Sequence, residues 1–123
     1  MKISKFTELE CWKKARELVN IIYQLTRKDT FKKDFGLVDQ IRRSAVSAMA
    51  NIAEGFGSRT NTEFIRFLNI SIRSLYETQS HLYIAIDQKY ADNDEFKVSD
   101  KLATDCINIC KGLVRYLSNS RKT

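Results

Sequence analysis

Residues 41–57, IRRSAVSAMANIAEGFG, have the periodicity of a helix with one apolar and one polar side. At about 100° per residue, the apolar arc collects Val38, Ile41, Ala45, Met49, Ile52 and Phe56. The polar side collects Arg43, Ser47, Asn51 and Glu54. Serine and asparagine are mediocre helix formers, so their presence on this side needs a reason. The stripe predicts hydrogen bonds to a closely approaching backbone, either within one subunit or between subunits.

Three further segments share this periodicity. The pattern predicts helices over residues 7–28, 37–56 and 61–89, and from 94 or 99 to 118. The chain has 123 residues, no proline and only four glycines, which favours a few long helices. Short links make neighbouring helices antiparallel. The sequence therefore predicts an all-α, up-down-up-down antiparallel four-helix bundle, a single domain over residues 1–123 with a basic, frayed tail at about 119–123.

Three local signals mark where these helices begin and end. Thr7 with Glu10, and Thr60 with Glu63, have the spacing of a capping box, in which the threonine hydroxyl accepts an amide N–H. A glycine within residues 55–57 is expected to close the second helix in the left-handed conformation.

Several residues with potential chemistry are predicted to pack in the core. Cys106 and Cys110 are four apart, the spacing of half a metal site, but they lie in the apolar stripe of the last helix. A free cysteine there behaves as a small hydrophobe. Trp12 also lies at core spacing, and Phe31 and Phe35 are expected to tuck under the link between the first two helices.

The composition indicates the setting and the kind of partner. The net charge of +6 will attract polyanions such as RNA, DNA or anionic lipid. Three cysteines, an odd number, argue against a disulfide framework and favour a cytoplasmic location. The first residues lack the apolar segment of a signal peptide, and no apolar run is long enough to span a membrane. No membrane partner is expected.

No catalytic constellation is evident. His81 is the single histidine and is expected to be a solvated surface residue. The Glu-x-x-His pairs of di-iron bundles are absent, so no metal or other cofactor is expected. Bundle-shaped nucleases of the higher eukaryote and prokaryote nucleotide-binding superfamily carry an arginine four to six residues before a histidine. Here Arg73 precedes His81 by eight residues, so a ribonuclease of bundle fold is the least favoured reading.

Two arginines stand out in the second helix. Arg42 projects into the edge of the apolar arc, where a guanidinium group needs a carboxylate or carbonyl partner. Glu77 and Glu54 are the candidate partners, in an ion pair that would fix helix register. The alternative is that Arg42 and Arg43 contact phosphate groups.

The third helix carries apolar residues on its polar side. Ile70 and Ile84 project there among Arg66, Arg73 and Glu77. Such outward isoleucines hint at a contact between subunits.

The chain resembles the bacterial four-helix bundle proteins encoded in intervening sequences of 23S rRNA genes. The resemblance is strongest over residues 40–47, QIRRSAVS, and residues 51–55, NIAEG. The residues that match the family pattern include Trp12, Arg42, Arg43, Ser47, Asn51, Glu54, Gly55 and Glu77. The chain departs from the family at Lys32 and near Met49, where proline is usual, and at Arg73, where glycine is usual.

The resemblance implies a bundle that assembles into a ring-like homopentamer and has no enzymatic activity. The accessory variability determinant proteins of diversity-generating retroelements are similar in fold and form basic pentamers that engage reverse transcriptase and RNA. We therefore expect a non-enzymatic homo-oligomer that binds RNA through a basic face, with Arg42, Arg43, Arg66 and Arg73 as the contact residues. The alternative is a protein-protein interaction scaffold that binds no nucleic acid.

Overall fold

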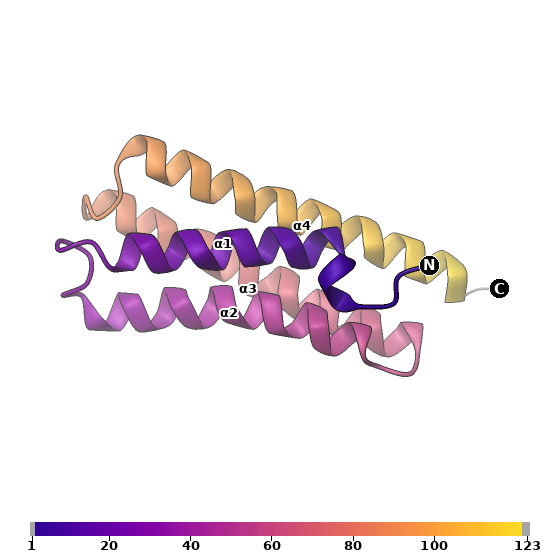
Figure 1. The fold of residues 1–123 in the computed structure, drawn as a ribbon. Coiled ribbons are helices and arrows are strands. Elements are labelled where there is room, and N and C mark those ends of the chain that lie inside the picture. Colours follow the sequence, from indigo (N-terminus) through magenta and orange to yellow (C-terminus); the bar gives the residue numbers. More distant parts are fainter. Residues whose placement is uncertain (1, 122–123) are drawn as a thin grey trace.

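The described part of the chain folds into four antiparallel helices joined by short links (Figure 1). The structure is a computed structural model and describes residues 2–121. A 3-10 turn, η1 (Phe6–Glu8), precedes α1 (Glu10–Thr26), α2 (Phe35–Phe56), α3 (Asn61–Asp87) and α4 (Asn93–Arg121). Both α1 and α3 contact α2 and α4, so α1 and α3 occupy opposite corners of the bundle. The predicted all-α, up-down-up-down bundle is confirmed.

Within residues 2–121, three of the four helix starts are capped by the residue just before them. Before α4, the Asp92 carboxylate accepts the Glu95 amide N–H at 2.8 Å. The Thr60 hydroxyl accepts the Glu63 amide N–H at 3.1 Å, as predicted. The Asp34 carboxylate accepts the Leu37 amide N–H at 3.2 Å and starts α2 two residues earlier than predicted.

The predicted cap at Thr7 is wrong. Thr7 lies inside η1, and the residue before α1 is Leu9, whose side chain makes no capping hydrogen bond. Glu8 instead accepts the Lys5 amide N–H at 3.0 Å. The extra turn brings Phe6 edge-on to Trp12, with ring centroids 5.2 Å apart. Trp12 itself is buried, as predicted.

The two links at one end of the bundle are tied together. Phe31 is fully buried under the α1–α2 link and stacks on Tyr90 of the α3–α4 link, with ring centroids 4.9 Å apart. The Tyr90 hydroxyl donates to the second carboxylate oxygen of Asp34 at 3.0 Å. Asp34 therefore caps α2 and holds the neighbouring link at the same time. Phe35, by contrast, is 80% exposed, so the expectation that it tucks under the link is wrong.

A ladder of hydroxyl groups runs along the contact between α2 and α3. Its hydrogen bonds join Ser44 to Thr78 (2.8 Å), Ser47 to Ser74 (3.1 Å), and Ser71 to the Ala48 carbonyl (2.8 Å). The Asn51 amide donates to the Ser47 carbonyl at 2.8 Å. The polar stripe predicted on the second helix is thus partly an internal seam within one subunit. Arg43 and Glu54, its other members, are exposed.

Gly55 lies within this seam. Gly57 follows α2 with φ −78°, and no glycine among the described residues has a positive φ, so the predicted left-handed glycine is wrong. A Cβ atom at Gly55 would lie 2.8 Å from Phe64 Cδ1 and 2.9 Å from Phe67 Cβ. The glycine is needed for close approach of α3, not for a turn.

The last helix is longer than predicted. It continues through Arg121, so fraying from residue 119 is not observed for residues 119–121. Residues 122 and 123 lie outside the described part of the chain.

Replacing Gly55 with alanine is expected to destabilise the protein by about 1–3 kcal/mol, because the added methyl group overpacks the α2–α3 seam. Gly57→Ala is the matched control, since a Cβ atom there would lie no closer than 3.6 Å to a neighbouring atom. Urea denaturation followed by circular dichroism measures both free energies of unfolding. Equal stabilities for the two variants would contradict the close approach assigned to Gly55.

Candidate interaction surfaces

The guanidinium group of Arg42 is held between α1 and α2. Its carbon lies 4.3 Å from the ring centroid of Tyr23, and its Nε donates to Thr26 Oγ1 at 2.8 Å. The buried Thr26 hydroxyl donates in turn to the Ile22 carbonyl at 2.8 Å. An aromatic ring and a hydroxyl group therefore hold this cation, so the predicted ion pair with Glu54 or Glu77 is wrong.

The reason is the position of Arg42 on α2. It faces α1, whereas Glu54 lies about 18 Å farther along the α2 axis and Glu77 lies on α3, on the other side of α2. A cation stacked on an aromatic ring keeps its charge without needing a carboxylate.

Around Arg42 the groove between α1 and α2 forms a partly apolar, positively charged surface. We call it the basic surface, and it consists of Tyr23, Arg27, Phe35, Val38, Arg42, Arg43 and Val46. It contains two shallow hollows of about 460 Å³ each. Two apolar side chains of this surface are exposed to water, namely Phe35, described above, and Val46, which is 42% exposed. Such a pair of exposed apolar side chains is unusual. Arg43 is paired with Asp39 at 2.9 Å.

The outer side of α3 carries the other two predicted arginines. Arg66 and Arg73 are exposed and lie on the same side of α3, about 10 Å apart along its axis. The Arg66 guanidinium carbon lies 4.5 Å from the ring centroid of Phe67. Within residues 2–121, no ion pair involves either arginine.

The four predicted arginines do not form one site. Gly55 of α2 abuts Phe64 and Phe67, so Arg66 is level with the end of α2. Arg43 is twelve residues before Gly55, which places it about 18 Å away along the bundle. Arg42 lies in the α1–α2 groove, and α1 does not contact α3. The structure thus divides the predicted basic face into two separate surfaces.

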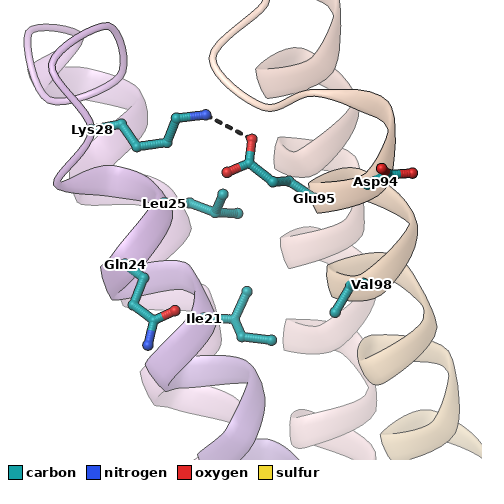
Figure 2. A pocket seen from close by; sticks show the side chains of 7 residues that line it. All are labelled: Ile21, Gln24, Leu25, Lys28, Asp94, Glu95 and Val98. Carbon is teal, nitrogen blue, oxygen red and sulfur yellow. Dashed lines mark hydrogen bonds and ion pairs between the residues drawn. The ribbon is translucent and has the colours of Figure 1, made fainter.

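A further hollow lies between α1 and α4. Seven residues line this space of about 340 Å³, namely Ile21, Gln24, Leu25, Lys28, Asp94, Glu95 and Val98. Figure 2 shows Ile21 of α1 and Val98 of α4 facing one another, with the Lys28–Glu95 ion pair spanning one end. That pair is 2.6 Å long. Sequence periodicity assigned no role to this hollow.

His81 is more shielded than predicted. Its side chain is 16% exposed, and its Nε2 lies 3.3 Å from a Glu77 carboxylate oxygen. Its Nδ1 is buried and has no hydrogen-bond partner among the described residues. His81 follows Thr78 by three residues and Ser74 by seven, so it shares the side of α3 that faces α2. The expectation of a solvated histidine is wrong.

The cysteines lie in the core. Cys11, Cys106 and Cys110 are buried and free, as predicted for the last two, and Cys106 Sγ donates to the Cys11 carbonyl at 3.3 Å. A hydrogen bond with Cys110, followed by burial, raises the pKa of the Cys11 thiol far above its usual range. A hydrogen bond with Cys106 contributes most to raising the pKa of Cys110. The Cys11 and Cys110 thiols therefore stay protonated, which makes these two side chains poor nucleophiles and poor metal ligands.

Residues 2–121 contain neither a metal-binding cluster nor a membrane-spanning helix. No three or more His, Cys, Asp and Glu side chains in this range are grouped so that they could hold a metal ion. None of its helices has the length and apolar character needed to cross a membrane.

A double-mutant cycle on Arg42→Met and Thr26→Val is expected to give a coupling energy of about 1 kcal/mol, because the hydrogen bond joins these two side chains. The matched cycle on Arg43→Met and Thr26→Val should give a coupling energy near zero. Thermal or urea unfolding of the single and double variants supplies the free energies. Additive effects in the Arg42 cycle would contradict the assigned contact.

Comparison with known proteins agrees with this architecture. The crystal structure of a protein of unknown function from the S23 ribosomal protein family of Bacteroides thetaiotaomicron VPI-5482 superimposes with a TM-score of 0.78. The two sequences are 24% identical, and the match covers 85% of this chain and 97% of the other, which shows a shared fold. No curated protein matches the chain.

A family comparison covers nearly the whole bundle. The model of the 23S rRNA-intervening sequence protein family matches residues 7–114. This range includes all of α1, α2 and α3 and most of α4. The chain belongs to the 23S rRNA-intervening sequence protein family.

Proposed function

We propose that this protein is a non-enzymatic four-helix bundle that self-associates and binds RNA through a basic face. The observation that carries the RNA proposal is the pair Arg66 and Arg73 on the outer side of α3. Both are exposed and free of ion pairs within the described residues, in a chain of net charge +6. Exposed guanidinium groups without an ion pair gain the most free energy from binding phosphates, because no internal ion pair has to be broken first.

The other two predicted contact residues are less suited to phosphate. Arg43 is already paired with Asp39, and Arg42 is both stacked on Tyr23 and hydrogen-bonded to Thr26. Arg66 also lies over a ring, that of Phe67, but within residues 2–121 its guanidinium group makes no hydrogen bond or ion pair that phosphate would have to replace. We assign the principal RNA contact to Arg66 and Arg73 for this reason.

Self-association is supported by the exposed apolar side chains. Phe35 and Val98 are 80% and 54% exposed, and each borders a hollow in the surface. We propose a homo-oligomer working in the cytoplasm, with five members by resemblance to the family. A protein partner, such as the reverse transcriptase engaged by the related retroelement proteins, belongs to the same proposal.

The second candidate is a protein-protein interaction scaffold without nucleic-acid binding. The basic surface favours it, because the surface combines Phe35 and Val46 with arginines that are partly engaged inside the protein. In that case, arginine substitutions would reduce folding stability and leave any RNA affinity unchanged. A bundle-fold ribonuclease is a further alternative, and structured RNA that stays intact during long incubation with the protein and a divalent metal would eliminate it.

RNA affinity is expected to fall steeply with salt and to depend little on sequence, because phosphate contacts dominate. The Arg66→Ala/Arg73→Ala variant should bind more weakly and reduce the slope of log K against log salt by about two. The control is Lys97→Ala/Lys101→Ala on α4, which removes the same net charge. Fluorescence anisotropy with a structured RNA across a salt series measures both quantities.

Either of two results would contradict the RNA proposal. One is an affinity that stays flat between low and moderate salt. The other is an equal loss of affinity in the arginine and lysine variants, because it would indicate attraction to net charge and not to the α3 surface.

A further inference from the structure

Charge is unevenly distributed along α3 and α4. Residues 64–76 of α3 contain no Asp or Glu, and neither do residues 106–121 of α4. Apart from Glu63, every acidic residue of these two helices lies within residues 77–105. Figure 1 shows the start of α3 and the end of α4 at the same end of the bundle. Because α3 and α4 pack against one another, the parts that lack acidic residues are neighbours.

These neighbouring parts carry a cationic surface that includes an aromatic ring. We call it the α3–α4 surface, and it consists of Arg66, Arg73, Tyr76, Lys111 and Arg115, all of which are exposed. None of its four cations has an ion pair within residues 2–121. Lys111 Nζ donates to the Tyr76 hydroxyl at 3.0 Å and so joins the two helices.

The cations extend in one direction from this contact. On α3, Arg73 and Arg66 precede Tyr76, and on α4 Arg115 follows Lys111 by one turn. Because the two helices are antiparallel, both directions lead toward the same end of the bundle. The positive charge thus extends over about 15 Å from Tyr76 to Arg66.

The ring of Tyr76 is available for stacking. The residue is 50% exposed, and no other aromatic ring of residues 2–121 packs on it. Lys111 Nζ lies 3.0 Å from the hydroxyl oxygen but 5.5 Å from the ring centroid. The amine is therefore located beyond the hydroxyl end of the ring and does not cover either face.

Tyr83 provides a contrast on the same helix. It is 56% exposed and follows Tyr76 by two turns, but its ring packs edge-on against Phe96, with centroids 4.8 Å apart. It also lies within residues 77–105, the part that contains the acidic side chains. An exposed tyrosine is thus not unusual in this chain, whereas a free ring among unpaired cations is found at Tyr76.

We propose that the α3–α4 surface binds single-stranded RNA, with one base stacked on Tyr76 and the adjoining phosphates bound by the four cations. The inference rests on the RNA binding proposed above and names the class of RNA. Proteins that hold single strands combine a cationic track for the backbone with aromatic rings for the bases. A duplex fits this surface less well, because its bases are stacked on one another and are not free to stack on a side chain.

The test compares an unstructured oligouridine of roughly 12 nucleotides with an RNA duplex of the same length. Tyr76→Leu removes the ring, and Tyr76→Phe keeps the ring without the hydroxyl group. Tyr83→Leu is the matched control, because it removes an equally exposed tyrosine outside the α3–α4 surface. Circular dichroism checks that each variant keeps its helices, and Tyr76→Gln replaces Tyr76→Leu if helicity is lost.

Fluorescence anisotropy should show that the wild type binds the single strand more tightly than the duplex. Tyr76→Leu should weaken binding of the single strand by about 5- to 150-fold, which is the contribution of one base stacked on an aromatic ring. Its affinity for the duplex should stay unchanged. Tyr76→Phe and Tyr83→Leu should bind both RNAs as the wild type does.

A salt series tests the cations of α4 separately. Lys111→Ala/Arg115→Ala should reduce the slope of log K against log salt for the single strand by about 1.4, since each phosphate contact on a single strand contributes about 0.7. Lys97→Ala/Lys101→Ala, which lies within the acidic part of α4, should leave this slope unchanged. Equal slopes for the two double variants would overturn the assignment of Lys111 and Arg115.

The outcomes separate this inference from the broader proposal. A wild type that binds neither RNA would overturn RNA binding and, with it, the preference for single strands. A wild type that binds the duplex at least as tightly would overturn that preference and leave RNA binding standing. Equal affinities of Tyr76→Leu and Tyr83→Leu, or of Tyr76→Leu and Tyr76→Phe, would overturn the stacking assigned to Tyr76.

Discussion

The close approach of α2 and α3 is the constraint on which the rest of the bundle depends. Gly55 lets the Phe64 ring and the Phe67 Cβ atom come within distances that no side chain at that position would permit. The hydroxyl groups of Ser44, Ser47 and Ser71 then bond across the seam without the bulk of longer polar side chains. Small residues thus bring two backbones together and also satisfy the polar atoms that this approach buries.

This seam determines which parts of α2 remain for other contacts. One side of α2 packs on α3 and another faces the core, so Arg42 and Val46 lie toward α1, at the edge of the α1–α2 groove. The guanidinium group of Arg42 is fixed there by a ring and a hydroxyl on α1. The α2–α3 contact fixes how α2 is rotated about its own axis. It therefore also determines which α2 side chains, Arg42 among them, face α1.

Most of the fold could be predicted from the sequence, and the reason is periodicity. Apolar spacing identified the four helices, and the short polar residues Ser47 and Asn51 indicated a close backbone. Periodicity gives the side of a helix on which a residue lies, but it does not identify the residue opposite. Periodicity for this reason predicts the wrong partners, Glu54 and Glu77, for Arg42. The observed partners, Tyr23 and Thr26, belong to α1 and precede Arg42 by sixteen or more residues. Apolar character alone predicts burial of Phe35, but Asp34 caps α2, so Phe35 is the first residue of the helix and its side chain is exposed.

The tie between the two links has a consequence for binding. Phe31, Tyr90 and Asp34 join the α1–α2 and α3–α4 links, and this is the end of the bundle at which the basic surface and the α1–α4 hollow lie. Segments that would otherwise move separately are already ordered before any partner arrives. A partner that docks at this end loses little affinity to the conformational entropy of these links, so a modest contact area can give a specific and rapidly formed complex.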